Sequence, residues 1–481
     1  MRRRTLLATG MAALGAGLTA ACDTTPDPAA FVTPDGEEVR AAEARRNPGT
    51  IRDIRLTSTA GPVDLGGTIV NTWSYDGQIP GRPIRITAGE QLRATLTKRL
   101  PEPTSIHWHG VALRNDNDGV PDLTQKHIPT GADHTYQFTA PHPGTYWLHP
   151  HTGVQLDRGL YAPLIVDDPH EPGGYDDEWI IVLDDWLDGI AGTPDDAFAG
   201  LRRGMMGGHG MTGAASSLLG GDAGDVAYPH FLLGGRLPAA PQVFTGRPGS
   251  RIRLRIINAA ADTAFRVALG GHRLTVTHTD GYPVQPVDTD ALLLGMGERY
   301  DALVTLDDGV FPLVALAEGK NATAFGLVRT SSGTAPGPAT RPRELDGRIV
   351  THRQLAPTDA TRLPTRPPDR TIRMALTGGM MGYDWAFNNR RHDLKRFEPI
   401  RAGERVHIEF VNTTMMWHPV HLHGHTFALT EGGARKDTAI VLPGQTLPVD
   451  FDADNPGRWM IHCHNAYHAQ AGMMTQLGYL R

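Results

Sequence analysis

The sequence predicts an all-β protein made of three β-sandwich domains. The composition is rich in turn formers, with 56 glycines and 37 prolines among 481 residues, which suits a turn-rich β protein better than a helical one. In addition, one pattern occurs three times: a glycine turn followed by a strand of alternating apolar and polar residues. The three copies cover residues 84–96, 243–256 and 400–410.

The spacing of these copies divides the chain. Their turn glycines, Gly89, Gly249 and Gly403, lie 160 and 154 residues apart, which is the length of a duplicated domain and not of a solenoid unit. Short alternating strands between turn residues are typical of a β-sandwich. The domains are expected at residues 49–170, 171–340 and 341–481.

The overall composition excludes several classes of protein. Apolar residues make up 40% and charged residues 20%, which argues against a disordered chain, a collagen and a multi-span membrane protein. The net charge is −6 and no long basic run is present, so nucleic acid is not an expected partner. Histidine is abundant, with 22 residues, whereas cysteine occurs twice. This bias indicates a transition metal.

The first 22 residues read as an export signal. A basic start precedes an apolar stretch at 6–21, which is shorter than the roughly 18–20 residues that cross a bilayer. Arg3 and Arg4 resemble a twin-arginine signal. We therefore expect an exported protein, in the periplasm or on the outer face of the cytoplasmic membrane.

The end of this signal has two interpretations. Residues 18–22 resemble a lipoprotein box, apart from Thr19, and a working box would attach a lipid anchor to Cys22. Simple cleavage near Ala21 is the alternative. The following residues, 23–48, are expected to form a solvated linker.

Histidine pairs of the form His-x-His carry the strongest functional signal. Alternate side chains of a strand share a face, so each pair offers two imidazoles in one direction. Residues 106–110 and 143–151 match residues 420–424 and 456–464, whereas the middle domain has neither motif. The pairs are therefore expected to be two halves of one copper or zinc cluster between the outer domains. They are His107/His109, His149/His151, His421/His423 and His462/His464.

The single internal cysteine indicates copper. Cys463 lies between two of these histidines, so its thiolate should point to the opposite face of the strand. Together with His418, His468 and a weak axial Met473 it would form the two-His, one-Cys set of a blue-copper centre. Met473 could instead be a core methionine. The matching residue of the first domain is Pro150, so no such centre is expected there.

Four motifs resemble the copper motifs of multicopper oxidases, and the resemblance runs from about residue 50 to the end. They are HWHG at 107–110, HPH at 149–151, HPVHLHGH at 418–425 and HCHNAYHAQAGM at 462–473. The resemblance implies three cupredoxin (Greek-key β-sandwich) domains and four copper ions per chain. It assigns His418, Cys463, His468 and Met473 to type 1 copper, His107 and His421 to type 2, and His109, His149, His151, His423, His462 and His464 to the type 3 pair. The leader and layout most resemble exported actinobacterial members linked to copper resistance.

The resemblance also implies a reaction, in which a donor is oxidised one electron at a time and dioxygen is reduced to two waters. The donor is expected near His468, whose edge reaches the surface in the family, and Cys463 would pass the electrons on. Asp118 matches an acid that supplies protons in the family, although it could be a turn residue before Gly119. Some relatives carry a second acid after the cysteine. Residues 465–469 contain none here, which puts that second proton route in doubt.

The donor is expected to be Cu(I), or a phenol or aromatic amine. Met380, Met381 and Met416 are predicted to bind Cu(I), because thioethers favour it; a second methionine cluster lies at 204–211. The other interpretation is that these methionines fill gaps in the core. Three alternatives are a laccase-like phenol oxidase, a copper nitrite reductase and a scaffold without copper. Histidines on both sides of Cys463 argue against the second, and the complete set of ligands argues against the third. We expect a monomer.

Overall fold

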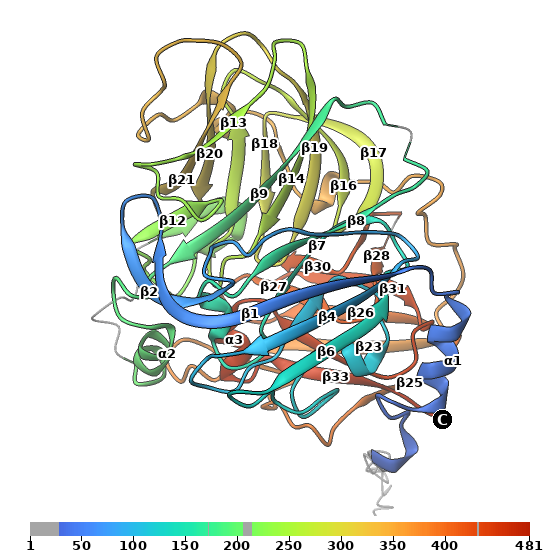
Figure 1. The fold of residues 1–481 in the computed structure, drawn as a ribbon. Helices are drawn as coiled ribbons and strands as arrows, with labels where there is room; N and C mark the ends of the chain where they lie inside the picture. Colours follow the sequence, from blue (N-terminus) through green and yellow to red (C-terminus); the bar gives the residue numbers. More distant parts are fainter. Residues whose placement is uncertain (1–27, 172, 205–213, 431) are drawn as a thin grey trace, which may run out of the picture.

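The computed structural model describes residues 28–171, 173–204, 214–430 and 432–481, and it confirms an all-β protein with cupredoxin-like sandwiches. The middle domain (green and yellow) stands above the first (blue to teal) and third (orange to red), which lie against each other (Figure 1). The α-helices of the described residues are α1 (Glu37–Arg45), α2 (Pro194–Arg202) and α3 (Ala466–Ala471). Short 3₁₀ helices occur at Pro28–Ala30, Asn115–Asn117, Gln155–Asp157, Ser217–Leu219, Arg343–Asp346 and His352–Gln354.

The first domain combines a sheet of order β2-β1-β4-β6 with one of order β3-β8-β7-β5. In β4 the alternation in sequence becomes alternation in burial, so Leu92, Ala94 and Leu96 face a core shared by both sheets. The strands are β1 (Ile51–Asp64), β2 (Ile69–Tyr75), β3 (Ile84–Thr87), β4 (Gln91–Lys98), β5 (His107–His109), β6 (Asp133–Thr139), β7 (Gly144–His149) and β8 (Ala162–Asp167).

The middle domain has two six-stranded sheets, of order β12-β9-β14-β19-β16-β17 and β13-β21-β20-β15-β18-β22, and a small β10-β11 pair. Because β22 pairs with β18, this sandwich reaches residue 350, beyond the expected boundary at 340. The strands are β9 (Asp177–Trp186), β10 (Ala215–Ser216), β11 (Gly221–Asp222), β12 (His230–Leu233), β13 (Gln242–Thr245), β14 (Arg251–Asn258), β15 (Phe265–Leu269), β16 (Leu274–Thr279), β17 (Tyr282–Thr289), β18 (Ala291–Leu294), β19 (Arg299–Thr305), β20 (Val310–Ala317), β21 (Ala322–Arg329) and β22 (Ile349–Val350).

The third domain has sheets of order β24-β23-β26-β31-β28-β29 and β25-β33-β32-β27-β30. Its strands are β23 (Arg370–Thr377), β24 (Ala386–Phe387), β25 (Glu398–Ile400), β26 (Arg405–Asn412), β27 (His418–Leu422), β28 (Phe427–Leu429), β29 (Arg435–Lys436), β30 (Thr438–Val441), β31 (Thr446–Asp452), β32 (Arg458–Cys463) and β33 (Met474–Tyr479).

The three sequence repeats occupy equivalent places in the three sandwiches. Gly89, Gly249 and Gly403 all have a positive φ between +81° and +88°, which glycine adopts without strain. The strand after each glycine pairs in parallel with the first long strand of its own domain, as β4 with β1, β14 with β9 and β26 with β23. The common topology supports duplication of one domain.

The segment before the first domain differs from the solvated linker that the sequence predicts. Phe31 is fully buried and forms a bridge with Leu480. The C-terminus lies near α1 in Figure 1. The Glu43 carboxylate of α1 accepts hydrogen bonds from the amide and hydroxyl of Thr139. Arg46 donates to Asn455 in the third domain. The linker prediction is therefore wrong from residue 28 onward, because the few apolar residues of this segment are enough to dock it.

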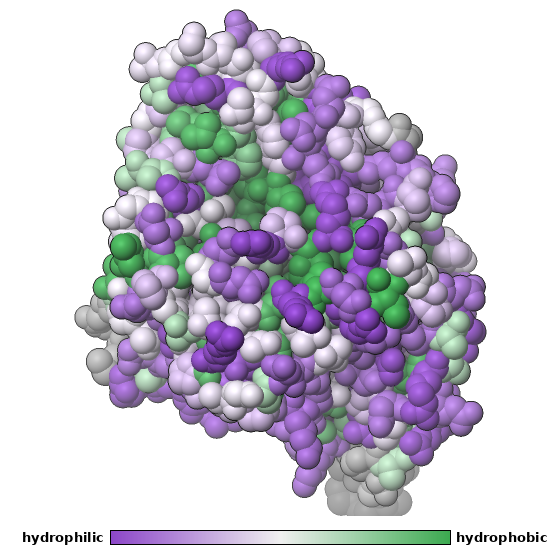
Figure 2. All heavy atoms as spheres, in the orientation of Figure 1, coloured by the Kyte–Doolittle hydropathy of each residue, from purple (hydrophilic) through white to green (hydrophobic). Residues whose placement is uncertain are grey.

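The face of the molecule seen in Figure 2 is mostly hydrophilic, with hydrophobic side chains in separate groups across its middle. None of the helices in the described part of the chain is long and apolar enough to cross a membrane. Residues 1–22, which carry the predicted export signal and Cys22, lie outside the described residues.

Candidate metal centres

Strand pairing brings the four histidine pairs together in two sets. In the first domain β5 pairs with β7 so that His107 lies opposite His149. In the third domain β27 pairs with β32 so that His421 lies opposite His462. Seven of the eight imidazoles are buried, and His151 is half-buried. Each outer domain thus presents four imidazoles from adjacent strands.

The two sets meet at the interface of the first and third domains. Nδ1 of His109 lies 3.2 Å from Nε2 of His464, and the rings of His109 and His421 stack with centroids 3.8 Å apart. The rings of His107 and His423 stack at the same distance. The eight predicted residues therefore form one cluster, as the sequence repeat indicates.

Hydrogen bonds fix which ring nitrogen faces the centre of this cluster. Nδ1 of His107 lies 2.8 Å from the carbonyl oxygen of Asp118, and Nδ1 of His421 lies 2.8 Å from that of Asp437. A carbonyl accepts only, so Nδ1 carries the proton and Nε2 is left with a free lone pair. Nε2 of His107, His149 and His421 is buried and has no hydrogen-bond partner among the residues that the structure describes. Such orphaned acceptors fit metal ligands.

Burial also favours the neutral form of six of these imidazoles. Desolvation, with help from neighbouring histidines, holds the pKa of His149 and His464 well below the usual range. Desolvation acts in the same direction on His109, His151, His423 and His462. Neutral imidazole is the form that binds a transition metal.

Asp118 touches both halves of the cluster. Its carboxylate lies 2.9 Å from Nδ1 of His423 in the third domain and 3.2 Å from Nδ1 of His107 in its own domain. It is fully buried beside the 3₁₀ turn at 115–117. Asp118 therefore contacts one predicted ligand from each of the two domains, which its place in a turn alone would not require.

A second group lies within the third sandwich. Sγ of Cys463 is 3.6 Å from Nδ1 of both His418 and His468, and the two Nδ1 atoms are 3.0 Å apart. All three side chains are fully buried. A first-row metal bonds nitrogen at about 2.0–2.1 Å and sulfur at about 2.3 Å, so one ion fits between these atoms. Two nitrogens and a thiolate are the ligands of a blue-copper site.

Helix α3 and the hydrogen bonds at its two ends fix the backbone around Met473. The Asn465 side chain caps this helix by accepting hydrogen bonds from the amides of Tyr467 and His468. At the other end, the amide of Cys463 donates to the carbonyl of Met473, whose own amide donates to the carbonyl of His468. The buried Met473 is thus tied by its backbone to two of the three predicted ligands. Asn465 has a structural role here, as the cap of helix α3.

His468 does not reach the surface. The sequence resemblance predicts an exposed edge, but this residue is 0% exposed. Nε2 lies 2.9 Å from the carboxylate of Asp225, which also accepts a 2.7 Å hydrogen bond from the hydroxyl of Tyr383. The ring of Trp385 covers it at 4.4 Å between centroids. That expectation was wrong, because Asp225 of the middle domain and the loop before β24 close over the ring.

The contact with Asp225 also acts on the pKa of His468. Burial lowers this pKa, but the Asp225 carboxylate, together with Cys463, outweighs burial and raises it to about 10. The contact thus pairs a carboxylate with the side of the ring that faces away from Cys463.

The predicted methionine site is only partly at the surface. Met381 is 94% exposed in the loop that carries Tyr383, and Met380 is half-buried. Met416 is 2% exposed and belongs to the core, whereas its neighbour Met415 is 87% exposed. The prediction for Met416 was therefore wrong, because the turn before β27 directs Met415 and not Met416 to solvent. The cluster at 205–211 lies outside the described residues.

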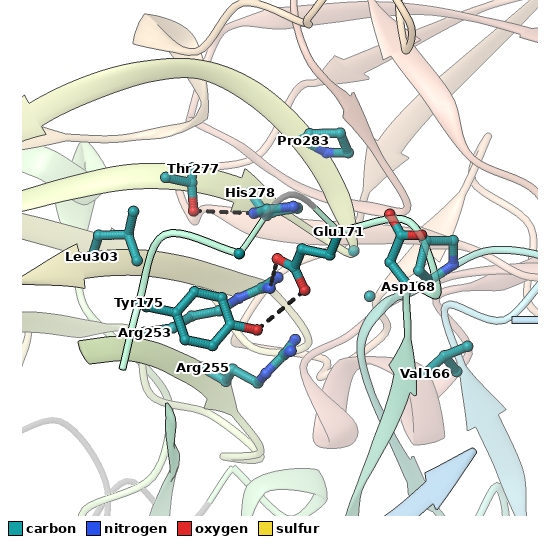
Figure 3. A pocket seen from close by; sticks show the side chains of 14 residues that line it. Val166, Asp168, Glu171, Tyr175, Arg253, Arg255, Thr277, His278, Pro283 and Leu303 are labelled. Carbon is teal, nitrogen blue, oxygen red and sulfur yellow. Dashed lines mark hydrogen bonds and ion pairs between the residues drawn. The ribbon is translucent and has the colours of Figure 1, made fainter. Parts of the chain in front are cut away.

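Of two cavities, one is lined by the predicted histidine ligands and the other is not. One of about 290 Å³ lies between the first and middle domains, and several polar groups of its lining pair with each other (Figure 3). There Glu171 accepts from Tyr175 at 3.1 Å and pairs with Arg253. A smaller cavity of about 70 Å³ is lined by His149, His151, His462, His464 and Gln470, among others. The smaller cavity gives a small molecule access to the histidine cluster.

Sequence reasoning missed several residues that contact the predicted ligands. Asp225, Asp437, Thr438 and Thr414 hydrogen-bond His468, His109, His421 and His418, in that order, and the tilted ring of Trp385 packs against His468. None of them belongs to a repeated motif. The short distance from Asp437 to the His421 motif was the only available signal.

Comparison with known proteins agrees with this architecture. Models of the multicopper oxidase family match residues 58–171, 177–333 and 365–479. Multicopper oxidase MmcO of Mycobacterium tuberculosis is 50% identical over 99% of this chain and 96% of its own. Copper resistance protein A of Escherichia coli is 27% identical over 89% of this chain and 92% of its own. The crystal structure of a laccase from Botrytis aclada, 25% identical, superposes with a TM-score of 0.76 over 89% of this chain and 88% of its own.

The chain belongs to the multicopper oxidase family. It is a copper-dependent oxidoreductase that uses dioxygen as its electron acceptor.

Proposed function

We propose that this multicopper oxidase oxidises Cu(I) in copper detoxification and holds four copper ions. The observation that carries the choice of donor is the buried contact between His468 and Asp225. A bulky phenol cannot touch a ring covered by Asp225, Tyr383 and Trp385. A small cation needs only a carboxylate and soft ligands near that ring.

The ligand assignment follows the two groups of side chains. His418, Cys463, His468 and Met473 would hold type 1 copper. His107 and His421, whose Nε2 atoms are buried without partners, would hold type 2 copper. The other six histidines of the cluster would hold the type 3 pair. When bound, copper would supply the capacity to take up electrons singly and to deliver four of them to dioxygen.

The chain itself provides the path between the two groups. Cys463 is bonded through the backbone to His462 and His464, and successive side chains of a strand point to opposite faces. Its sulfur therefore lies in one group while its neighbours lie in the other, connected by a few covalent bonds. Reduction of dioxygen to two waters consumes four electrons and four protons, and the Asp118 carboxylate lies where it can transfer protons at the cluster.

Exposed thioethers support Cu(I) as the donor. Met381 precedes Tyr383 by two residues, and Met415 follows Thr414, whose hydroxyl bonds Nε2 of His418 at 2.8 Å. Both methionines are therefore close in the chain to side chains that touch the predicted type 1 ligands. Relatives named copper resistance protein A agree with this proposal. Oxidation of phenols is the second candidate, because relatives named laccase share 29% identity.

The test separates the two donors. Met381→Leu and Met415→Leu, combined, should reduce the rate of Cu(I) oxidation several-fold and leave phenol oxidation unchanged, since leucine keeps the volume but loses the thioether. Met416→Leu makes the same chemical change in a buried neighbour and serves as the control. Oxygen uptake is measured with each donor. Equal rates of Cu(I) oxidation in the double variant and the control would reject the proposal.

We also propose that the protein is exported, that Cys22 carries a lipid anchor, and that the chain acts as a monomer. The basic start, the apolar stretch and the box at 18–22 support export and lipidation. Mass spectrometry of the mature N-terminus tests the anchor, and Cys22→Ala should release the protein from the membrane fraction. An N-terminus cleaved near Ala21 without lipid would reject it. Sedimentation tests the monomer.

A further inference from the structure

The middle domain holds none of the predicted ligands, yet one of its turns reaches the histidine cluster. A Cβ atom on Gly297, which has a φ of +84°, would lie 2.8 Å from Cδ2 of His464 and 3.0 Å from Cε1 of His109. The turn between β18 and β19 therefore packs directly against two imidazoles. Arg299, two residues further on, is fully buried.

Arg299 connects all three domains. Its guanidinium donates two hydrogen bonds, of 2.7 and 2.6 Å, to the two carboxylate oxygens of Asp437 in the third domain. Nε donates to the carbonyl of Thr145 in the first domain at 3.1 Å. Nη1 also donates to the carbonyl of Gly297 at 3.0 Å. A planar guanidinium is suited to such a fixed array of acceptors.

Asp437 in turn contacts one histidine from each half of the cluster. Its carboxylate lies 3.1 Å from Nε2 of His109, so that the Nδ1 of this ring faces His464, and 3.5 Å from Nδ1 of His421. Its carbonyl accepts from Nδ1 of His421, which leaves Nε2 of that ring free. Asp437 thus contacts Nε2 of His109 but Nδ1 of His421, so that different ring nitrogens of the two histidines are turned away from it.

Asp280, which like Arg299 belongs to the middle domain, fixes the backbone around Asp437. Asp280 accepts from the amides of Asp437 and Thr438 at 3.2 Å, and it pairs with Lys436 at 3.1 Å. The backbone of this segment therefore has its own support, which leaves the side chain of Asp437 to be oriented by Arg299.

We propose that Arg299 is a positioning residue for the histidine cluster: by holding the Asp437 carboxylate it orients the rings of His109 and His421, which both face that carboxylate. This inference rests on the ligand set proposed above. It assigns the middle domain a role in the cluster that its missing motifs conceal.

The test is Arg299→Lys, which keeps the charge but cannot reproduce the two parallel hydrogen bonds to Asp437. The variant should stay blue, because the type 1 group lies elsewhere, while the type 2 copper is held about tenfold less tightly. Competition with a chelator measures the affinity, and electron paramagnetic resonance reports the type 2 signal. Arg266→Lys is the matched control, since Arg266 forms the same fork with Glu318 in the middle domain, at 2.8 and 2.7 Å.

A second variant tests whether Arg299 acts through Asp437. Asp437→Asn keeps the volume, and it should lower type 2 affinity by at least as much as Arg299→Lys. The double variant should be no worse than Asp437→Asn alone, because coupled residues are not additive. If Arg299→Lys gives no blue protein, Asp437→Asn alone tests whether the Arg299–Asp437 pair positions the cluster.

Two results in the Arg299 and Asp437 variants would overturn this inference: a type 2 affinity and signal unchanged from the native protein, or losses that add in the double variant. An equal loss in Arg266→Lys would reduce Arg299 to a general stabilising residue and also overturn it. Failure of the proposed ligand set looks different, because the native protein would then hold no type 2 copper. Failure of Cu(I) as the donor would leave the copper affinities of all these variants as predicted.

Discussion

Replacing Asp225 by asparagine should raise the reduction potential of the type 1 copper by roughly 100 mV. The carboxylate lies 2.9 Å from Nε2 of His468, on the far side of the ring from Cys463. At a separation of roughly 7 Å from a metal at Nδ1 and an effective dielectric constant of about 20, Coulomb's law gives about 2 kcal/mol. That energy corresponds to roughly 100 mV for a one-electron couple. The potential rises because a negative charge stabilises Cu(II) more than Cu(I).

A redox titration followed through the blue absorption band measures this shift. Asp188→Asn is the control, because Asp188 is equally buried in the middle domain but bonds Thr72 and Arg158. The band itself should remain in both variants, since neither residue is a ligand. An Asp225→Asn potential equal to that of the control would refute the electrostatic contact between Asp225 and His468.

Three further predictions concern the axial ligand, the proton supply and acid stability. Met473→Leu should raise the type 1 potential and keep the blue band; an unchanged potential in redox titration would make Met473 a packing residue. Asp118→Asn should slow reoxidation by dioxygen while reduction of type 1 copper stays fast, and stopped-flow traces that match the native enzyme would contradict its role in proton transfer. Burial lowers the pKa of His352 to about 3, so that as the pH falls the unfolded chain binds this proton at a higher pH than the folded protein does. Stability should therefore fall by about 1.4 kcal/mol per pH unit between pH 6.5 and 3 from this residue alone. In denaturant titrations of His352→Gln, the free energy of unfolding should fall less steeply with decreasing pH than in the native protein. An equal dependence on pH would contradict this role of His352.

Local patterns were sufficient to predict most of the cluster and its fold. His-x-His on a strand places two rings on one face whatever the rest of the chain does, and the repeat of residues 143–151 at 456–464 ties the first and third domains to one site. Cys463 between two histidines likewise fixes a thiolate on the opposite face. These inferences depend only on neighbours in sequence.

Residues that act across domain interfaces could not be predicted in the same way. Asp225 and Arg299 come from the middle domain, and only the packing of three sandwiches brings them to His468 and Asp437. The burial of Met416 depends on one turn, which sends Met415 outward instead. Docking of residues 28–48 rests on a few contacts such as Phe31 with Leu480, which composition does not reveal.

The central claim is that Cys463 serves one copper group while its two neighbours serve the other. Cys463→Ser removes the thiolate and leaves His462 and His464 in place, so the most direct measurement is copper content together with the visible absorption of this variant. The account predicts loss of the blue band and one copper ion fewer per chain, with the type 2 signal retained. A variant that stays blue, or that loses the copper of both groups at once, would contradict it.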